Sequence, residues 1–546
     1  MLSLSHLGRQ LPPLLLVLVA ASASAQSFRV QCPPTTSLHP SGGPSTAYNG
    51  PTTANRTVTR SDGTTFTLPY VDNGGAVKCQ QISGGDGFAT MGDGTQTYLF
   101  GFGPLSGLAD MVSALPGTQP ASIFNANNAP IAANINIGDP QPGYTFNGAI
   151  GLVPDPESVP TANALTGHVD PRLIMDVGVM NANMPAPMMA IDEDDEFFLT
   201  LTNVGQIMRP DLFEQHTVHF HGYPNASSFY DGVPDASIAI NIGGSFTYYY
   251  LAPDAGTYFW HCHISPPAHL QMGMVGQIYV RPRQNRVPLG HSLYASLAGG
   301  SGLAGADASG QQSDLRTKCG TDILCATPLP PANSVVQATN PRTGQPQMYA
   351  YNDGDGSTRY DVEYPIQIMG FDPNFHFVGM TFNPESFTDM KDKHFLLNGR
   401  SYPDTILPGT MQTQSTDGTL HSSQPLPTII NIPAGGRALL RIASLDVTQY
   451  QTLASLGIPM RVIALNARLL RDLAGNDMTY LTNSITLGGG ESLDVILDAA
   501  GLVAGQKFYL YTPNLDHLSN DAENFGGLMT EVNICTAVNP TTKTCS

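Results

Sequence analysis

The chain has 546 residues, of which only 12% are charged, and its formal net charge is −19 at pH 7. This length is enough for roughly two or three hydrophobic cores, so we expect several domains. Lys and Arg form no clustered basic run, and phosphate binding depends on such clusters, so a nucleic-acid partner is disfavoured. The acidity otherwise indicates little beyond solubility.

The first 25 residues have the pattern of a secretory signal. Arg9 precedes the apolar run 14–21, and the small residues at 23–25 offer a cleavage site. No later segment has the roughly 18 unbroken apolar residues that a membrane helix requires. We therefore expect a soluble, exported mature chain with no membrane span, whether its destination is a periplasm, a cell surface or the medium.

Short alternating apolar segments bounded by Gly, Pro, Asn and Asp recur along the chain, and helical periodicity is scarce, so we expect an all-β fold. Residues 195–203 alternate, and Phe246, Tyr248 and Tyr250 share one face of another predicted strand. Both patterns are typical of sandwich strands with one buried face. Residues 26–164 are rich in Gly, Asn and Thr and show little pattern. They predict an irregular N-terminal arm or a small β subdomain.

A thiolate, several imidazoles and a thioether come together between residues 216 and 274. A blue copper centre uses two imidazole nitrogens and a cysteine sulfur in one plane, with a weakly held methionine sulfur on the axis. The candidate ligands are His216, Cys262, His269 and Met274. Zinc is the main competing metal, because Cys and His also suit tetrahedral zinc, but the methionine and the flanking His-x-His pattern favour copper.

Around this cluster the chain resembles the multicopper oxidase and copper nitrite reductase superfamily, which is built from cupredoxin domains. HTVHFHG, DGVP, GTYFWHCH and HLQMGM occur over residues 165–284 in the order that this family uses. FLLNGRSYPDT and INIPAGGRALLRI resemble a second, copper-poor domain, placed at 356–546. The resemblance implies two cupredoxin-like Greek-key β-sandwich domains. It also implies that Met274, five positions after His269, is the axial ligand rather than Met272.

The cysteines fit an oxidising compartment, because six of the seven remain once Cys262 is reserved for copper. Several pairings are formally open. Sequence neighbours suggest three pairs: Cys32–Cys79, Cys319–Cys325 and Cys535–Cys545. Between the two domains, residues 285–355 include the stretch SLAGGSGLAGADASG, which predicts a flexible linker.

Two His-x-His pairs accompany the predicted blue copper site: His219 with His221, and His261 with His263. The multicopper oxidases that the chain resembles reduce oxygen at a trinuclear cluster held by four such pairs from two domains. No further pair occurs here, so this pattern cannot assemble a complete cluster. The four imidazoles could still hold one or two additional copper ions. The alternative is a vestigial cluster in which the imidazoles hydrogen-bond one another or water.

In the nitrite reductases that the chain also resembles, a second-site histidine follows the blue-copper histidine by five positions, and another precedes the copper cysteine. His221 and His261 match these places. The third ligand there comes from a neighbouring subunit of a trimer, and His517 is the candidate for it. His219 departs from the pattern, since those reductases have a catalytic aspartate in its place. DGVP at 231–234 invites a catalytic interpretation, but an Asp-Gly turn is the simpler prediction.

Three functions remain open. The leading one is a secreted copper-dependent oxidoreductase of multicopper-oxidase type. It would take electrons from a small-molecule or protein donor at the blue copper and pass them through Cys262 to a second, His-bound copper site that reduces oxygen or another small acceptor. The second is a nitrite-reductase-like trimeric enzyme. The third is a non-enzymatic electron-transfer, copper-binding or structural protein in which only the blue copper site is active. No catalytic residue is assigned beyond the metal ligands.

Overall fold

The computed structural model describes residues 31–127, 145–146, 149–150, 182–297, 335–378 and 386–546, apart from short gaps at 51, 61, 108–109, 112, 207, 210–211, 213, 223–226, 253, 415–417, 419 and 473–474. The predicted signal and the Cys319–Cys325 pair lie outside the described residues. The remaining two predicted disulfides are confirmed, and Cys262 is free. Among the described helices, none is both long enough and apolar enough to cross a membrane.

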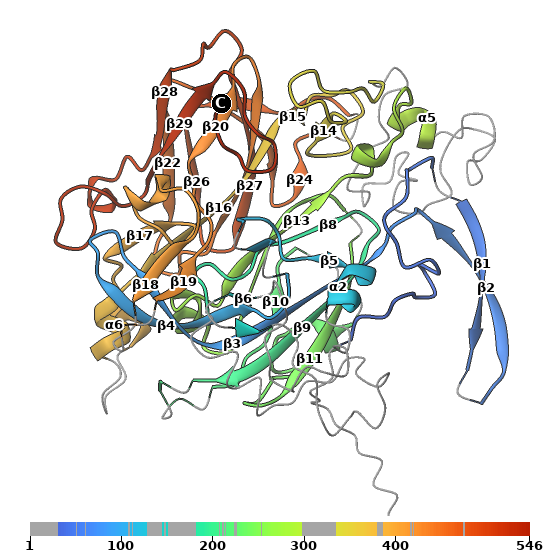
Figure 1. Cartoon of the computed structure of the whole chain (residues 1–546), viewed down its shortest axis with the longest axis horizontal. Helices are drawn as coiled ribbons and strands as arrows, with labels where there is room; N and C mark the ends of the chain where they lie inside the picture. The colour runs from blue at the N-terminus through green and yellow to red at the C-terminus, as the bar shows by residue number, and fades with distance from the viewer. Residues whose placement is uncertain are drawn as a thin grey trace, which may run out of the picture.

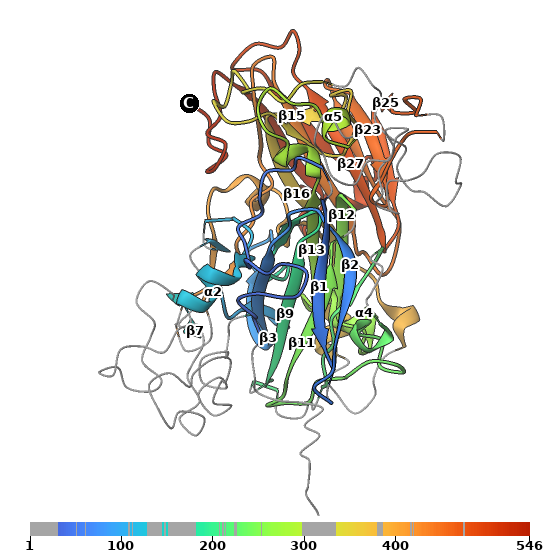
Figure 2. The same cartoon turned by 90° about the vertical axis from the view of Figure 1, so that its right-hand side faces the viewer.

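The all-β prediction is confirmed, because the described chain consists mainly of strands arranged in two β-sandwiches (Figure 1). Figure 2 shows the second sandwich stacked above the first. The helices are short: α2 (Ala121–Asn127), α4 (Pro266–Gln271), α5 (Leu293–Leu297) and α6 (Pro373–Val378). Small two-stranded sheets complete the fold: β1 (Thr52–Thr59) with β2 (Thr65–Asp72), β6 (Thr145–Phe146) with β7 (Ala149–Ile150), β14 (Met348–Tyr349) with β15 (Arg359–Tyr360), and β18 (Met411–Gln414) with β19 (Leu420–Gln424).

The first sandwich packs two sheets of strand order β10-β12-β13-β8 and β11-β9-β3-β4 around one core. The first sheet contains β8 (Met189–Asp192), β10 (His219–Phe220), β12 (Gly256–His261) and β13 (Val275–Arg281). The second contains β3 (Val77–Thr90), β4 (Gln96–Pro104), β9 (Glu196–Gly205) and β11 (Ser245–Leu251), and β5 (Gln119–Pro120) pairs with β3. Both strands predicted from alternation, β9 and β11, are confirmed, but β9 is buried on both faces.

Residues 77–104 belong to the first sandwich, which corrects the expected separation of 26–164 from the copper-binding domain. β3 runs parallel to β9 in the same sheet and is almost entirely buried. Its apolar pattern is interrupted by glycines that close packing requires. A Cβ on Gly84 would lie 2.7 Å from Cδ2 of His216, and one on Gly87 would lie 2.6 Å from the carbonyl oxygen of Ala182. The strand therefore supports the predicted metal site directly.

The second sandwich lies within the predicted range 356–546 and has its own apolar core. One sheet contains β16 (Val362–Phe371), β17 (His394–Leu397), β21 (Arg437–Ser444), β23 (Met460–Leu465), β24 (Arg468–Leu469), β25 (Tyr480–Thr482) and β27 (Glu491–Asp498). The other contains β20 (Ile430–Pro433), β22 (Gln451–Leu456), β26 (Ser484–Leu487), β28 (Lys507–Tyr511) and β29 (Met529–Cys535).

The two sandwiches meet where β12 and β13 of the first contact β16, β21 and β27 of the second. Thr257 on β12 donates a hydrogen bond to Asp494, and Ser492 donates to the carbonyl oxygen of Thr257 at 2.8 Å. Gln277 on β13 donates to the carbonyl oxygen of Arg441 at 2.8 Å. A small apolar cluster drawn from both domains packs beside these bonds. The second domain is therefore held against the strand that carries His261.

We expect Gly84→Ala to destabilise the metal-free protein by about 1–3 kcal/mol, because the added methyl group overpacks the site against His216. The measurement is the free energy of unfolding in urea. Gly101→Ala is the matched control, since Gly101 lies on the neighbouring strand β4 and a Cβ there has no neighbour closer than 3.3 Å. Equal stability of the two variants would contradict the proposed close contact between β3 and His216.

Candidate functional site

Two groups of metal-ligating side chains occur among the described residues, and the sequence predicted members of both. In the first group, ligand atoms of His216, Cys262 and His269 all lie within 4.8 Å of one another. In the second group, the same limit holds for His219, His221 and His261. The fold thus brings together residues that lie far apart in the sequence: His216 and His269 are 53 positions apart, and His219 and His261 are 42 positions apart.

Two antiparallel strands place the groups on opposite faces of one sheet. β10 pairs with β12 so that His219 lies opposite His261, and Phe220 lies opposite Trp260. Successive side chains of a strand point to opposite faces. The two His-x-His pairs therefore project on one side, while Cys262, between His261 and the next histidine, projects on the other side into the core of the first sandwich.

The first group is sealed inside that core. His216, Cys262 and His269 are 0%, 0% and 1% exposed. Among the described residues, neither ring nitrogen of His216 has a hydrogen-bond partner, and Nδ1 of His269 has none either. Buried polar atoms are normally hydrogen-bonded. These nitrogens, beside a thiol that accepts the N–H of Thr217 at 3.5 Å, fit a bound metal ion of the kind that prefers imidazole and thiolate.

The surroundings shift the pKa values of the two imidazoles in this group in opposite directions. Burial, assisted by the nearby His269, holds the pKa of His216 well below its ordinary value, so His216 is neutral as a metal ligand must be. Burial alone would lower the pKa of His269, but Cys262 and Glu214 outweigh it and raise this pKa to about 9, so a metal ion would bind His269 by displacing a proton. Oε2 of Glu214 lies 3.7 Å from Nε2 of His269, which leaves Nδ1 for a metal. Sequence reasoning did not anticipate Glu214.

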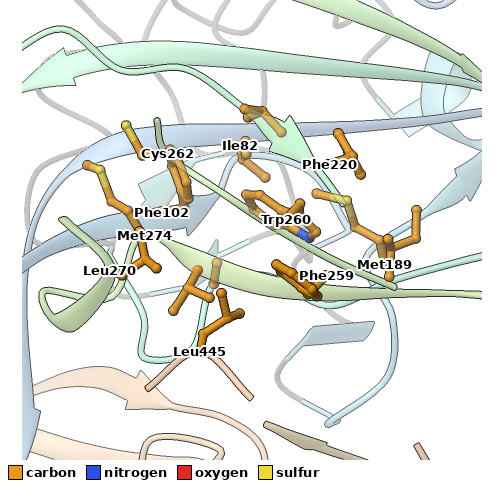
Figure 3. Close-up of a cluster of buried hydrophobic side chains, with 14 of the residues drawn as sticks. Ile82, Phe102, Met189, Phe220, Phe259, Trp260, Cys262, Leu270, Met274 and Leu445 are labelled. Atoms are coloured by element: carbon orange, nitrogen blue, oxygen red, sulfur yellow. The ribbon is translucent and has the colours of Figure 1, made fainter. Parts of the chain in front are cut away.

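Helix α4 and the turn after it return the chain from His269 to the core. The N–H of Met274 donates to the carbonyl oxygen of His269 at 2.9 Å, and the N–H of Cys262 donates to the carbonyl oxygen of Met274 at 3.0 Å. Met272 and Met274 are both fully buried. Figure 3 shows Cys262 and Met274 in one buried cluster with Trp260. The loop therefore carries Met274 to the backbone of the candidate copper cysteine.

The second group presents ring nitrogens to one another. Nε2 of His221 lies 2.9 Å from Nε2 of His261, and Nδ1 of His261 lies 2.6 Å from the carbonyl oxygen of Cys262. Nδ1 of His261 must donate to that carbonyl, so its Nε2 is an acceptor. His221 can donate to it, as the vestigial alternative requires, or both can ligate one ion. His263 lies beside the group, with its ring centroid 5.1 Å from that of His219.

The DGVP segment does more than turn the chain. The carbonyl oxygen of Asp231 lies 2.6 Å from Nδ1 of His219, and its carboxylate lies 3.5 Å from the same atom. Gly232 has φ +79°, and a Cβ there would lie 2.0 Å from the carbonyl oxygen of Val218. The predicted turn is therefore also the support that orients His219 and leaves its Nε2 for a metal.

The second group lies at a cavity of about 550 Å³ between the domains. His221 and His261 line one side, and residues 445–450 and 488–491 of the second domain line the other. Burial is the main cause that lowers the pKa of His221 to about 4 and that of His261 to about 3, and neighbouring imidazoles lower both further. Both side chains are neutral at pH 7, which is the form that binds metal.

One carboxyl group of the second domain, that of Asp446, lines the same cavity. The hydroxyl oxygen of Thr448 lies within hydrogen-bond distance of the carboxyl groups of both Asp446 and Asp392. Burial, together with the charge of Asp446, raises the pKa of Asp392 to about 8, so Asp392 retains a proton at neutral pH. No sequence signal marks this pair of carboxyl groups, because they come together only in the fold.

His517, the candidate ligand for a neighbouring subunit, is already engaged within its own domain. Its Nδ1 lies 2.8 Å from Oε1 of Gln451, and its Nε2 lies 2.9 Å from Nδ2 of Asn514. The ring is buried and stacks on Phe395 at a centroid distance of 4.0 Å. The expectation that His517 offers a free nitrogen to a second copy is therefore wrong in this arrangement.

The geometry agrees with comparisons to known proteins. Residues 166–285 match the family model described as multicopper oxidase. This range nearly coincides with the predicted copper-binding domain and contains the candidate ligands of both metal groups. The resemblance to the multicopper oxidase and copper nitrite reductase superfamily is thereby confirmed over this part of the chain.

Curated relatives match a similar length of the chain. The laccase abr2 of Aspergillus fumigatus is 34% identical over 109 residues, which are 20% of this chain and 17% of that protein. A copper-containing nitrite reductase of Neorhizobium galegae is 33% identical over 117 residues, 21% of this chain and 28% of that protein. The matches thus span less than a third of these relatives. A solved multicopper oxidase, mgLAC, superposes with a TM-score of 0.45 at 15% identity over 84% of this chain and 86% of that one.

We expect Cys262→Ser to abolish the intense visible absorption of the copper-loaded, oxidised protein, because a thiolate ligand gives a copper centre this character. The measurement is an optical spectrum with a parallel test of folding by circular dichroism. Met208→Ser, at a position that is 46% exposed, is the control and should keep the band. A band retained by Cys262→Ser would contradict the ligand assignment.

The pKa of Asp392 makes a prediction about stability. Asp392 binds its proton more tightly in the folded than in the unfolded state, and this difference stabilises the fold. The stabilisation is complete below about pH 4 and is lost as the pH rises through about 8. The free energy of unfolding of Asp392→Asn should therefore fall less than that of the wild type between pH 4 and pH 8. At pH 8 it should be higher than that of the wild type by at least about 1 kcal/mol. Urea unfolding at pH 4 and pH 8 measures it, with the exposed Asp355→Asn as control. Parallel pH profiles of Asp392→Asn and wild type would refute the shift.

Proposed function

We propose that the protein is an exported copper-dependent oxidoreductase of multicopper-oxidase type, which takes electrons singly from a small-molecule or protein donor and delivers them to oxygen or another small acceptor. The proposed blue copper ligands are His216, Cys262, His269 and Met274. The proposed ligands of the second copper site are His219, His221, His261 and His263. The observation that carries the proposal is that Cys262 of the first group directly follows His261 of the second.

Copper at the two groups would supply the one-electron chemistry, which these side chains do not offer by themselves. The chain supplies the connection between them. Cys262 and His261 are covalent neighbours, and the Nδ1–H of His261 donates to the carbonyl oxygen of Cys262 at 2.6 Å. This hydrogen bond gives a second path from Cys262 to the imidazole of His261. It crosses fewer covalent bonds than the path through the backbone and side chain of His261. The contact supports electron routing through Cys262.

The surroundings of the second group support reduction of a small acceptor there. The cavity beside His221 and His261 is large enough for a small molecule and is covered by the second domain. Reducing oxygen or nitrite consumes protons, and Asp392, beside Asp446, retains one at neutral pH. Export is supported by the Cys32–Cys79 and Cys535–Cys545 disulfides, which are typical of oxidising compartments.

A nitrite-reductase-like enzyme is the second candidate. The match to the Neorhizobium galegae protein and the positions of His221 and His261 favour it. Two observations count against it: a histidine occupies position 219, where those reductases have an aspartate, and His517 has both nitrogens engaged. We therefore rank the oxidase first, and treat the non-enzymatic electron carrier as an outcome of the following test.

Copper content separates these functions. We expect at least two copper ions per chain, a blue spectrum, and oxygen uptake with an artificial electron donor. His221→Ala should reduce the copper content by one ion or more and abolish oxygen uptake while the blue band remains, because only the second group is disturbed. Elemental analysis, optical spectra and an oxygen electrode measure the three properties. His291→Ala, at an exposed position, is the matched control.

A blue protein with one copper ion per chain would contradict the second site and point to an electron carrier. Nitrite reduction without oxygen uptake would favour the reductase instead. A colourless protein that takes up no copper would refute the proposal altogether and indicate a vestigial cluster.

A further inference from the structure

A second cavity, of about 420 Å³, lies where both sandwiches meet the C-terminal segment. None of the candidate copper ligands lines it. The end of β13 contributes Tyr279 and Arg281, the beginning of β16 contributes Glu363, and the C-terminal segment contributes Lys543. Its volume is within the range of small-molecule sites, which are typically mostly apolar with a few convergent polar groups.

The two carboxylates in its wall are already paired. Glu363 accepts from Arg281 at 2.6 Å and from the buried Arg441 at 3.0 Å. Burial alone would raise the pKa of Glu363, but these guanidinium groups and Lys543 outweigh it and lower the pKa, so Glu363 is ionised. Asp361 accepts from the amide of Asn340 at 2.7 Å, and also accepts the N–H of residue 437. Neither carboxylate needs a further cation.

The ammonium group of Lys543, by contrast, has no acceptor among the described residues, because its Nζ forms no hydrogen bond or ion pair with any of them. Nζ lies over the ring of Tyr364, whose centroid is 5.8 Å away. Burial lowers the pKa of Lys543, the positive Arg281 lowers it further, and Glu363 opposes both. A half-buried cation without a partner is unfavourable, so an anion in the cavity would be stabilised there.

The backbone around Lys543 holds this side chain in place. The amide of Asn431 donates to the carbonyl oxygen of Lys543 at 2.8 Å, and the N–H of Lys543 donates to the carbonyl oxygen of Asn539 at 2.9 Å. The Cys535–Cys545 disulfide closes the segment. The backbone of Lys543 is therefore anchored at the wall of the cavity.

Arg281 offers a second donor on the same wall. Its Nε and Nη2 bond to Glu363 and Tyr279, and Nη1 bonds to no described residue. The guanidinium side chain is 29% exposed, so a ligand can reach it. Tyr279, Met188 and Met348 supply apolar surface in the same cavity. Because the protein as a whole carries a charge of −19, an anion requires such a local pair of cations to bind.

We propose that this cavity binds a small carboxylate with an apolar body, such as an aromatic acid. The carboxylate would pair with Lys543 and Nη1 of Arg281, and the body would pack against Tyr279 and the two methionines. Such a ligand would contact both sandwiches and the C-terminal segment at once.

Isothermal titration calorimetry with benzoate tests this site. We expect saturable binding of one benzoate per chain, and binding of the neutral benzamide at least tenfold weaker. Lys543→Met should weaken benzoate binding at least tenfold, while Lys543→Arg, which keeps the charge, should stay within about threefold of wild type. Lys507→Met is the matched control and should leave binding unchanged, because Lys507 pairs with Glu531 outside the cavity.

Three results would overturn the proposal: no saturable benzoate binding to the wild type, equal binding of benzoate and benzamide, or undiminished binding by Lys543→Met. Circular dichroism and copper content, compared between Lys543→Met and wild type, show whether the variant is folded. If Lys543→Met is misfolded, the comparison of benzoate with benzamide on the wild type decides the question. These measurements do not use oxygen uptake, so their outcome is independent of the proposed oxidase function.

Discussion

The pairing of β10 with β12 is the constraint on which the site depends. Opposite His219 lies His261, and from there the alternation of side chains sends imidazoles to one face of the sheet and Cys262 to the other. A slip of one residue would reverse both faces and place the thiol between the domains. Both candidate copper groups therefore depend on this one register. A single peptide bond, between His261 and Cys262, connects the two groups along the chain.

The second sandwich forms the other side of the cavity at His221 and His261. None of its described residues belongs to either group. Hydrogen bonds from Thr257 and Ser492 join the two domains at β12, the strand that carries His261. The second domain thus shapes the cavity at the site and places Asp446 beside it.

The strand β3 shows why pattern reasoning failed between residues 26 and 164. Strand prediction relies on β-branched and aromatic residues, whereas β3 has glycines at two places where the strand packs closely. There its backbone lies so near His216 and Ala182 that no room remains for a methyl group. The sequence presents these glycines as a loop signal. Only the packed structure shows that close contacts require them, one with the candidate ligand His216 and one with Ala182. The contacts of Glu214 with His269 and of Asp231 with His219 likewise appear only in the folded chain.

The sequence by itself determined the all-β character, the eight candidate ligands, the two disulfides that the described residues contain, and the free Cys262. These depend on local chemistry: turn residues, the His-x-His period, and donor types that suit copper. Tertiary structure decided which ring nitrogens remain unpartnered among the described residues, that burial and Asp446 raise the pKa of Asp392, that β3 belongs to the first sandwich, and that Lys543 lines a cavity. Each of these joins residues far apart in the chain, and a buried group's partners and pKa depend on neighbours that only folding supplies.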